Sequence, residues 1–156
     1  MKQKTKIVIG ILALLLMICG LAWWFLPVRF LRGVAPEEVV TVQVCNGNNG
    51  HEFEITDANA ISYLVKEIQQ IAFQKEGFAS EVPIWYQLTF FNKSGEKIVT
   101  FGVQNTSLMR KEITQKWTVF YGCHGELNAV GEELERLESA QFPDYNKDPA
   151  FSTYKP

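Results

Sequence analysis

Two cysteines and two histidines carry the most versatile ligand chemistry in the chain beyond its N-terminal apolar stretch: Cys45, His51, Cys123 and His124. Structural zinc sites present such ligands as Cys-x₂₋₄-Cys and His-x₃₋₅-His pairs. Here Cys123 and His124 are adjacent, and neighbouring residues of a strand point to opposite faces of a sheet. We therefore predict no metal site from this set, and expect both histidines to be solvated turn residues.

The two cysteines could instead form a disulfide. Cys45 and Cys123 each lie at the end of a predicted strand beside a turn. A bridge requires Cα atoms within about 7 Å and an oxidising compartment. If the first and last strands are neighbours, it would close a loop of about 80 residues and stabilise the fold by about 4 kcal/mol. The alternative is two buried thiols.

A set of oxygen-bearing side chains near the C-terminal end could bind calcium. Asp144, Asn146 and Asp148 resemble the start of a calcium-binding loop. That loop needs Gly at its sixth position and Glu at its twelfth, where this chain has Pro149 and Lys155.

The candidate acids for an enzyme are Glu52, Asp57 and Glu126, and their positions show no pairing suited to acid–base catalysis. Neither a Gly-x-Ser-x-Gly motif nor a phosphate-binding glycine loop occurs. We therefore predict no catalytic and no cofactor-binding residue.

The N-terminal region has the composition of a membrane span. Residues 7–28 are 22 positions without a charge, and a helix needs roughly 20 apolar residues to cross the hydrocarbon core. Trp23 and Trp24 lie near its C-terminal end, where indole rings favour the headgroup region. We predict a transmembrane helix over residues 7–28 that contacts membrane lipid, with both tryptophans as interfacial anchors.

Basic residues predict the orientation of this helix. Lys2, Lys4, Lys6 and the α-amino group precede it, whereas Arg29 and Arg32 follow it. The excess on the N-terminal side favours a cytoplasmic N-terminus and an extracytoplasmic domain.

A cleaved secretory signal is the alternative, with residues 1–6 as the basic region, residues 7–18 as the apolar region and cleavage after Gly20-Leu21-Ala22. The apolar run is long for a signal and lacks a clean Ala-x-Ala site, so we favour a retained anchor. Both hypotheses place the residues beyond about 33 outside the cytoplasm.

The exported part is acidic. From Gly33 onward the chain has ten basic and seventeen acidic residues, a net charge of −7, which the whole-chain value of −2 conceals. Such a domain lacks the basic surface that nucleic acid requires, and its net charge predicts repulsion from anionic lipid heads. We expect a protein or envelope partner and no nucleic acid.

Hydrophobic periodicity predicts the elements of this domain. Alternation over residues 39–45 and around Phe53 and Ile55 predicts a hairpin across the turn at residues 46–50. Thr56 or Asp57 can cap a following helix, whose apolar stripe runs from Ile61 to Ile71. Further strands are expected over residues 73–78, 84–91, 97–103, 107–113 and 117–121.

A last helix is predicted over residues 126–140, with an apolar seam and an acidic solvent side. Leu127, Val130, Leu134 and Leu137 form the seam, and Glu132, Glu133, Glu135 and Glu138 are assigned to the solvent side.

The order hairpin, helix, meander, helix predicts an α+β fold in which two helices pack on one face of an antiparallel sheet. The expected organisation is a cytoplasmic N-terminus (1–6), a transmembrane helix (7–28), a juxtamembrane connector (29–38), an extracytoplasmic α+β domain (39–142) and an irregular C-terminal tail (143–156).

The stretch from Val42 to Leu64, with its Asn-Gly-Asn-Asn-Gly turn and its Ile55-Thr56-Asp57 helix start, resembles small uncharacterised membrane-anchored exported proteins of Gram-positive bacteria. This resemblance implies an N-terminal anchor or lipid and one α+β domain, and it transfers no functional residue.

We expect a non-enzymatic, membrane-tethered extracytoplasmic domain that binds a partner or regulates a neighbouring membrane protein. The alternatives are a secreted or envelope-associated enzyme and a structural subunit of a membrane complex. Aromatic side chains on both faces of the strand at residues 84–91 also make one sheet face a candidate binding surface.

Overall fold

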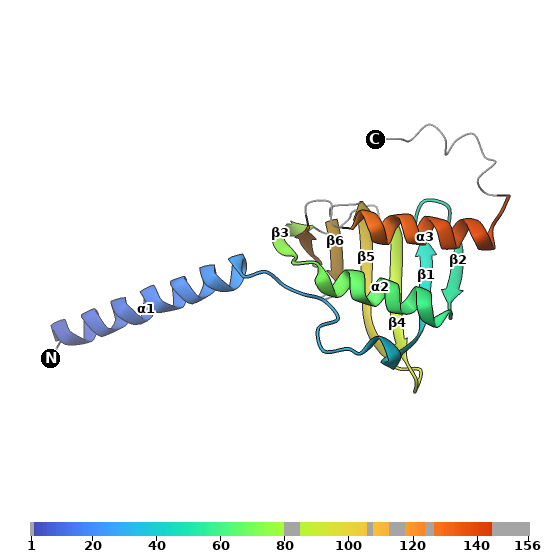
Figure 1. Cartoon of the computed structure of the whole chain (residues 1–156). Helices are drawn as coiled ribbons and strands as arrows, with labels where there is room; N and C mark the ends of the chain where they lie inside the picture. Colours follow the sequence, from blue (N-terminus) through green and yellow to red (C-terminus); the bar gives the residue numbers. More distant parts are fainter. Residues whose placement is uncertain (1, 80–84, 106–107, 113–117, 124–126, 145–156) are drawn as a thin grey trace.

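The computed structural model describes residues 2–79, 85–105, 108–112, 118–123 and 127–144 (Figure 1). An N-terminal apolar helix precedes one antiparallel sheet and two further helices, which confirms the predicted α+β class. The helices are α1 (Lys2–Phe25), the short 3₁₀ turn η1 (Pro36–Glu38), α2 (Ala58–Gln70) and α3 (Asn128–Gln141). The strands are β1 (Val39–Asn46), β2 (Glu52–Ile55), β3 (Gln74–Ala79), β4 (Tyr86–Asn92), β5 (Lys97–Asn105), β6 (Leu108–Glu112) and β7 (Thr118–Gly122).

The sheet has the strand order β2-β1-β4-β5-β6-β7-β3, and every neighbouring pair is antiparallel. Strands β4 to β7 form the expected meander. The strand predicted over residues 73–78 is present as β3, but it does not precede β4 in the sheet, because it pairs with β7 at the opposite edge. Both edges of β4 are already occupied, by β1 and by β5, so β3 has no place beside its successor in the chain.

Helices α2 and α3 lie on the same side of the sheet (Figure 1). The Asp57 carboxylate caps α2 by accepting from the Ala60 amide at 2.8 Å. The predicted stripe of α2 is buried at Ile61, Leu64, Val65 and Ile68. On the facing strand Leu88 and Phe90 are fully buried, since every second residue of β4 points toward the helices.

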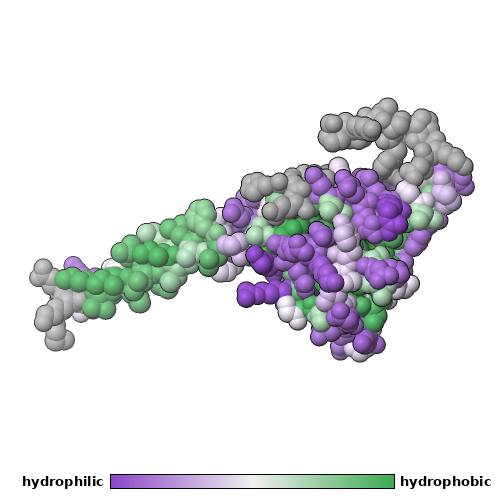
Figure 2. Space-filling view, viewed as in Figure 1, coloured by the Kyte–Doolittle hydropathy of each residue, from purple (hydrophilic) through white to green (hydrophobic). Residues whose placement is uncertain are grey.

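Helix α1 projects from the domain as an apolar rod (Figure 2). Thr5–Phe25 is 21 residues long, its most apolar 18-residue stretch has a mean hydropathy of 2.6, and none of that stretch is buried. It is therefore long and apolar enough to cross a membrane, a property that signal sequences share.

The segment after α1 belongs to the core of the domain. Phe30 and Leu31 are only 4% and 7% exposed. The Phe30 ring packs on three aromatic rings, with centroids 5.0 Å from Phe73, 5.0 Å from Phe101 and 4.9 Å from Tyr121. The expected connector over residues 29–38 is thus an ordered part of the fold at its N-terminal end.

Replacing Phe30 with alanine should lower the free energy of unfolding of the domain by about 3–5 kcal/mol, because it removes a buried ring and leaves a cavity among three others. Urea unfolding of the full chain in a non-ionic detergent measures this loss. Phe25→Ala is the matched control, since the Phe25 side chain is 72% exposed. Equal stability of the two variants would mean that Phe30 is not a core residue.

Candidate functional site

The end of α1 is held against the edge strand β3 by one lysine. The Lys75 ammonium lies 3.7 Å from the centroid of the Trp23 ring and donates a hydrogen bond to the Trp23 carbonyl at 2.5 Å. A cation over an indole face is attracted by the ring quadrupole. Trp24 is half-buried beside it. The two predicted interfacial tryptophans therefore lie where the helix meets the domain.

The chain joins the sheet soon after the helix ends. The Val28 amide donates to the Phe73 carbonyl at 2.7 Å, and the Phe73 amide donates to the Val28 carbonyl at 2.9 Å. This bridge extends the β3 edge by one residue pair. Only residues 26 and 27 separate α1 from an ordered hydrogen-bonded position.

A tight turn follows the bridge. Leu31 and Gly33 have φ angles of +56° and +84°, and the left-handed region costs a side-chain-bearing residue such as Leu31 about 1–2 kcal/mol. The Gln69 amide nitrogen of α2 donates to the Leu31 carbonyl at 2.8 Å and to the Val34 carbonyl at 2.7 Å. Burial of Leu31 and these two hydrogen bonds hold the turn in place.

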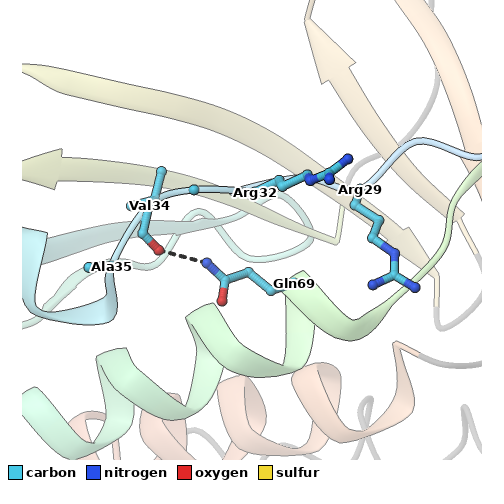
Figure 3. A pocket seen from close by; sticks show the side chains of 6 residues that line it. Arg29, Arg32, Val34, Ala35 and Gln69 are labelled. Carbon is cyan, nitrogen blue, oxygen red and sulfur yellow. Dashed lines mark hydrogen bonds between the residues drawn. The ribbon is translucent and has the colours of Figure 1, made fainter.

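The turn borders a hollow of about 540 Å³ lined by Arg29, Arg32, Gly33, Val34, Ala35 and Gln69. Figure 3 shows both arginine side chains reaching from this segment, and the Gln69 side chain reaching across from α2 to the Val34 carbonyl. Both arginines are exposed. Within the described part of the chain, neither guanidinium forms an ion pair with a carboxylate.

A second polar cluster is buried between the hairpin, β4 and α3. The Glu138 carboxylate is 1% exposed and accepts hydrogen bonds from four side chains. The donors are Asn46 Nδ2 (2.9 and 3.1 Å), Asn49 Nδ2 (2.9 Å), His51 Nδ1 (2.9 Å) and Tyr86 Oη (2.7 Å). The His51 ring also stacks on Phe142, with centroids 4.2 Å apart.

Burial of Glu138 raises the pKa of its carboxyl, but hydrogen bonds from Asn49, Tyr86, Asn46 and His51 outweigh that effect and leave it below its ordinary value. An ionised carboxylate only accepts hydrogen bonds, so His51 carries its proton on Nδ1. With these donors around it and almost no exposure, the carboxylate is a fixed anion that ties three elements together. It has no access to a substrate proton.

The expectation for Glu138 was wrong, because it was assigned to the solvent side of α3. His51 does lie in the loop between β1 and β2, but only 28% of its side chain is exposed, and its ring contacts Glu138 and Phe142. Glu138 follows Leu134 by four residues, so it continues the buried stripe of α3. The asparagines of the hairpin turn supply the donors that make burial of its charge tolerable. Helical spacing alone could have placed Glu138 inside, whereas its partners come from distant parts of the chain.

The structure forms no bridge between Cys45 and Cys123. Strands β4, β5 and β6 lie between β1 and β7, which separates the two by about 19 Å at the usual strand spacing, far beyond the bonding range of about 7 Å. The condition that the first and last strands be neighbours is not met. Burial, together with the charge and hydrogen bond of Glu52, raises the pKa of the Cys45 thiol, which favours its unreactive protonated form.

The other sequence-level candidates do not converge on a site. Asp57 caps α2, and Glu52 lies on the edge strand β2 beside Cys45. Glu126, His124 and the tail from residue 145 lie outside the described residues. Lys2, Lys4 and Lys6 lie in the first turns of α1, at the end away from the domain.

Comparisons with known proteins give no match for this chain to a family model, a curated protein or a solved structure.

Glu138→Gln should lower the free energy of unfolding by about 2–3 kcal/mol at neutral pH, because a neutral amide replaces the charge that four donors stabilise. Because the folded-state pKa is lowered, the ionised carboxylate stabilises the fold above its ordinary pKa of 4.5. This contribution is lost as the pH falls through the lower folded-state value. Denaturant unfolding at several pH values should show that the difference in free energy of unfolding between the wild type and Glu138→Gln becomes smaller below about pH 4.5.

Glu132→Gln, on the exposed side of the same helix, is the matched control and should change stability by less than about 0.5 kcal/mol. A wild-type advantage that grew on acidification would contradict the role assigned to Glu138.

Proposed function

We propose that this chain is a non-enzymatic, membrane-tethered extracytoplasmic domain that binds a partner or regulates a neighbouring membrane protein. The observation that carries the proposal is the direct passage from the apolar helix α1 into the core of the domain. Four residues separate Phe25, the last residue of α1, from the buried Phe30. Five extended residue steps span at most about 17 Å, so a membrane-inserted α1 keeps the domain at the headgroup surface.

Tethering suits a binding module of modest affinity. A domain confined to the membrane surface meets a neighbouring membrane protein at a high effective concentration, so a small number of contacts suffices for binding. A hydrogen-bonded junction adds restricted orientation to this proximity. A flexible linker would give the proximity without the orientation.

The contact between Trp23 and Lys75 favours a retained helix over a cleaved signal. Cleavage after Ala22 would leave Trp23 as the new N-terminus and would expose the apolar residues that follow it. In the intact chain these residues continue a helix whose end is fixed to β3 by Lys75. A retained α1 therefore agrees better with the geometry of the junction.

A non-enzymatic role agrees with the structural roles of two acidic residues, Glu138 and Asp57. The most deeply buried carboxylate, Glu138, is saturated by donors, and Asp57 is used as a helix cap. General acid–base catalysis requires a carboxyl group within hydrogen-bonding reach of a substrate. Glu138 lacks that access because it is 1% exposed, and the exposed Asp57 is engaged as the cap of α2.

The proposal predicts that the full chain needs detergent for extraction and that protease added to intact cells digests the domain. Intact mass should show residues 1–22 retained. Changing Lys2, Lys4 and Lys6 to glutamine should invert the orientation of a substantial fraction of the molecules, because Arg29 and Arg32 then outnumber the N-terminal charge. In those molecules the domain should resist protease added to intact cells.

A matched control changes three lysines that are far from the helix along the sequence, Lys93, Lys97 and Lys155, to glutamine and should leave the topology unaltered. A wild-type domain that is digested only after cell lysis would refute the extracytoplasmic location. A mature chain that lacks residues 1–22 would refute the tether.

A further inference from the structure

We infer that the hollow at Arg29 and Arg32 binds the phosphate headgroup of an anionic phospholipid in the leaflet beside the domain. This inference rests on the proposed function, because it requires α1 to remain in the membrane. It adds a ligand class and a site that the tether alone does not imply.

The position of the hollow is the first argument. Arg29 and Arg32 are four and seven residues beyond Phe25, the last residue of α1. Trp23 and Lys75 mark the level at which the helix leaves the hydrocarbon, because indole rings and ammonium groups favour the headgroup region. A hollow that opens just beyond them lies at the depth of lipid phosphates.

Its chemistry is the second argument. A guanidinium presents several N–H donors in a planar fork that matches phosphate oxygens. Two such groups line the hollow, and within the described residues neither is neutralised by a carboxylate. The volume of about 540 Å³ exceeds that of a phosphate group and leaves room for the rest of a headgroup.

The backbone that carries the arginines is the third argument. Leu31 adopts a left-handed conformation that is unfavourable for leucine, and its burial leaves the neighbouring Arg32 exposed. Gln69 fixes the carbonyl groups on both sides of Arg32. Locally strained backbone persists where the surrounding structure holds it, and such positions cluster at ligand sites. The turn thus fixes the backbone from which the exposed Arg32 side chain extends.

The acidic character of the domain does not oppose this site. The net charge of −7 from Gly33 onward predicted repulsion from anionic lipid, yet Arg29 and Arg32 line the hollow that follows α1, and Lys75 contacts the end of that helix. At physiological ionic strength charges are screened beyond about 8 Å. Along the chain, the acidic residues nearest to Arg32 are Glu37 and Glu38. They belong to η1, which lies further from α1 than the segment that carries the arginines (Figure 1).

Thermal unfolding of the full chain in a non-ionic detergent, with short-chain phosphatidylglycerol added, tests the inference. The lipid should raise Tm in a salt-sensitive manner. Short-chain phosphatidylcholine and inorganic phosphate, at the same concentrations, should have much smaller effects. In the double variant Arg29→Gln/Arg32→Gln, the lipid concentration for half-maximal shift should rise about thirtyfold.

The double variant Lys93→Gln/Lys97→Gln is the matched control, because it removes the same charge from the β4–β5 hairpin and should keep the wild-type response. An undiminished shift in the arginine variant, or an equal loss in the lysine variant, would overturn the site. A shift of equal size with phosphatidylcholine or with free phosphate would overturn its selectivity for an anionic lipid. Intact mass lacking residues 1–22 would instead show that the tether itself fails.

Discussion

Packing of the Phe30 ring against Phe73, Phe101 and Tyr121 is the interaction on which the arrangement of this molecule depends. Without it, α1 would be joined to the domain by a free linker, and the domain could tumble relative to the helix. With it, the chain passes from lipid-compatible helix to buried core within five residues. The Val28–Phe73 bridge and the Lys75–Trp23 contact then complete a junction with one orientation. Both the tether and the proposed lipid site follow from this constraint.

Local periodicity was sufficient to predict nearly every helix and strand of the domain, because burial on one face imposes a period of two or 3.6 residues. The α+β class and the buried stripe of α2 followed from the same patterns, and Asp57 is one of the two residues expected to cap α2. Pairing between distant strands could not be predicted. Sequence alone does not show that β1 inserts between β2 and β4 and so sends β3 to the far edge, which also removes the basis for a Cys45–Cys123 bridge.

The proposed lipid site was harder to predict than the fold, because its parts are distant in sequence. In the sequence, Arg29 and Arg32 counted only as charges that oppose the predicted orientation of the helix, and Gln69 lies outside the apolar stripe of α2, so the pattern gives it no role. Only the folded chain brings the Gln69 amide to the Leu31 and Val34 carbonyls. Glu138 shows the same limit, since a glutamate on an apolar stripe is tolerable only with donors supplied by the Asn46–His51 turn and Tyr86.

Hydrogen exchange at the Val28 amide tests the central claim, the ordered junction, most directly. Val28 donates to the Phe73 carbonyl at 2.7 Å, so in the detergent-solubilised full chain its amide should exchange as slowly as the amides of β4 and β5. Protection at Val28 and at Phe73 should be lost together with that of the sheet as urea is added. Exchange of Val28 at the rate of an unstructured peptide, while the sheet remains protected, would show that α1 and the domain are joined by a flexible linker.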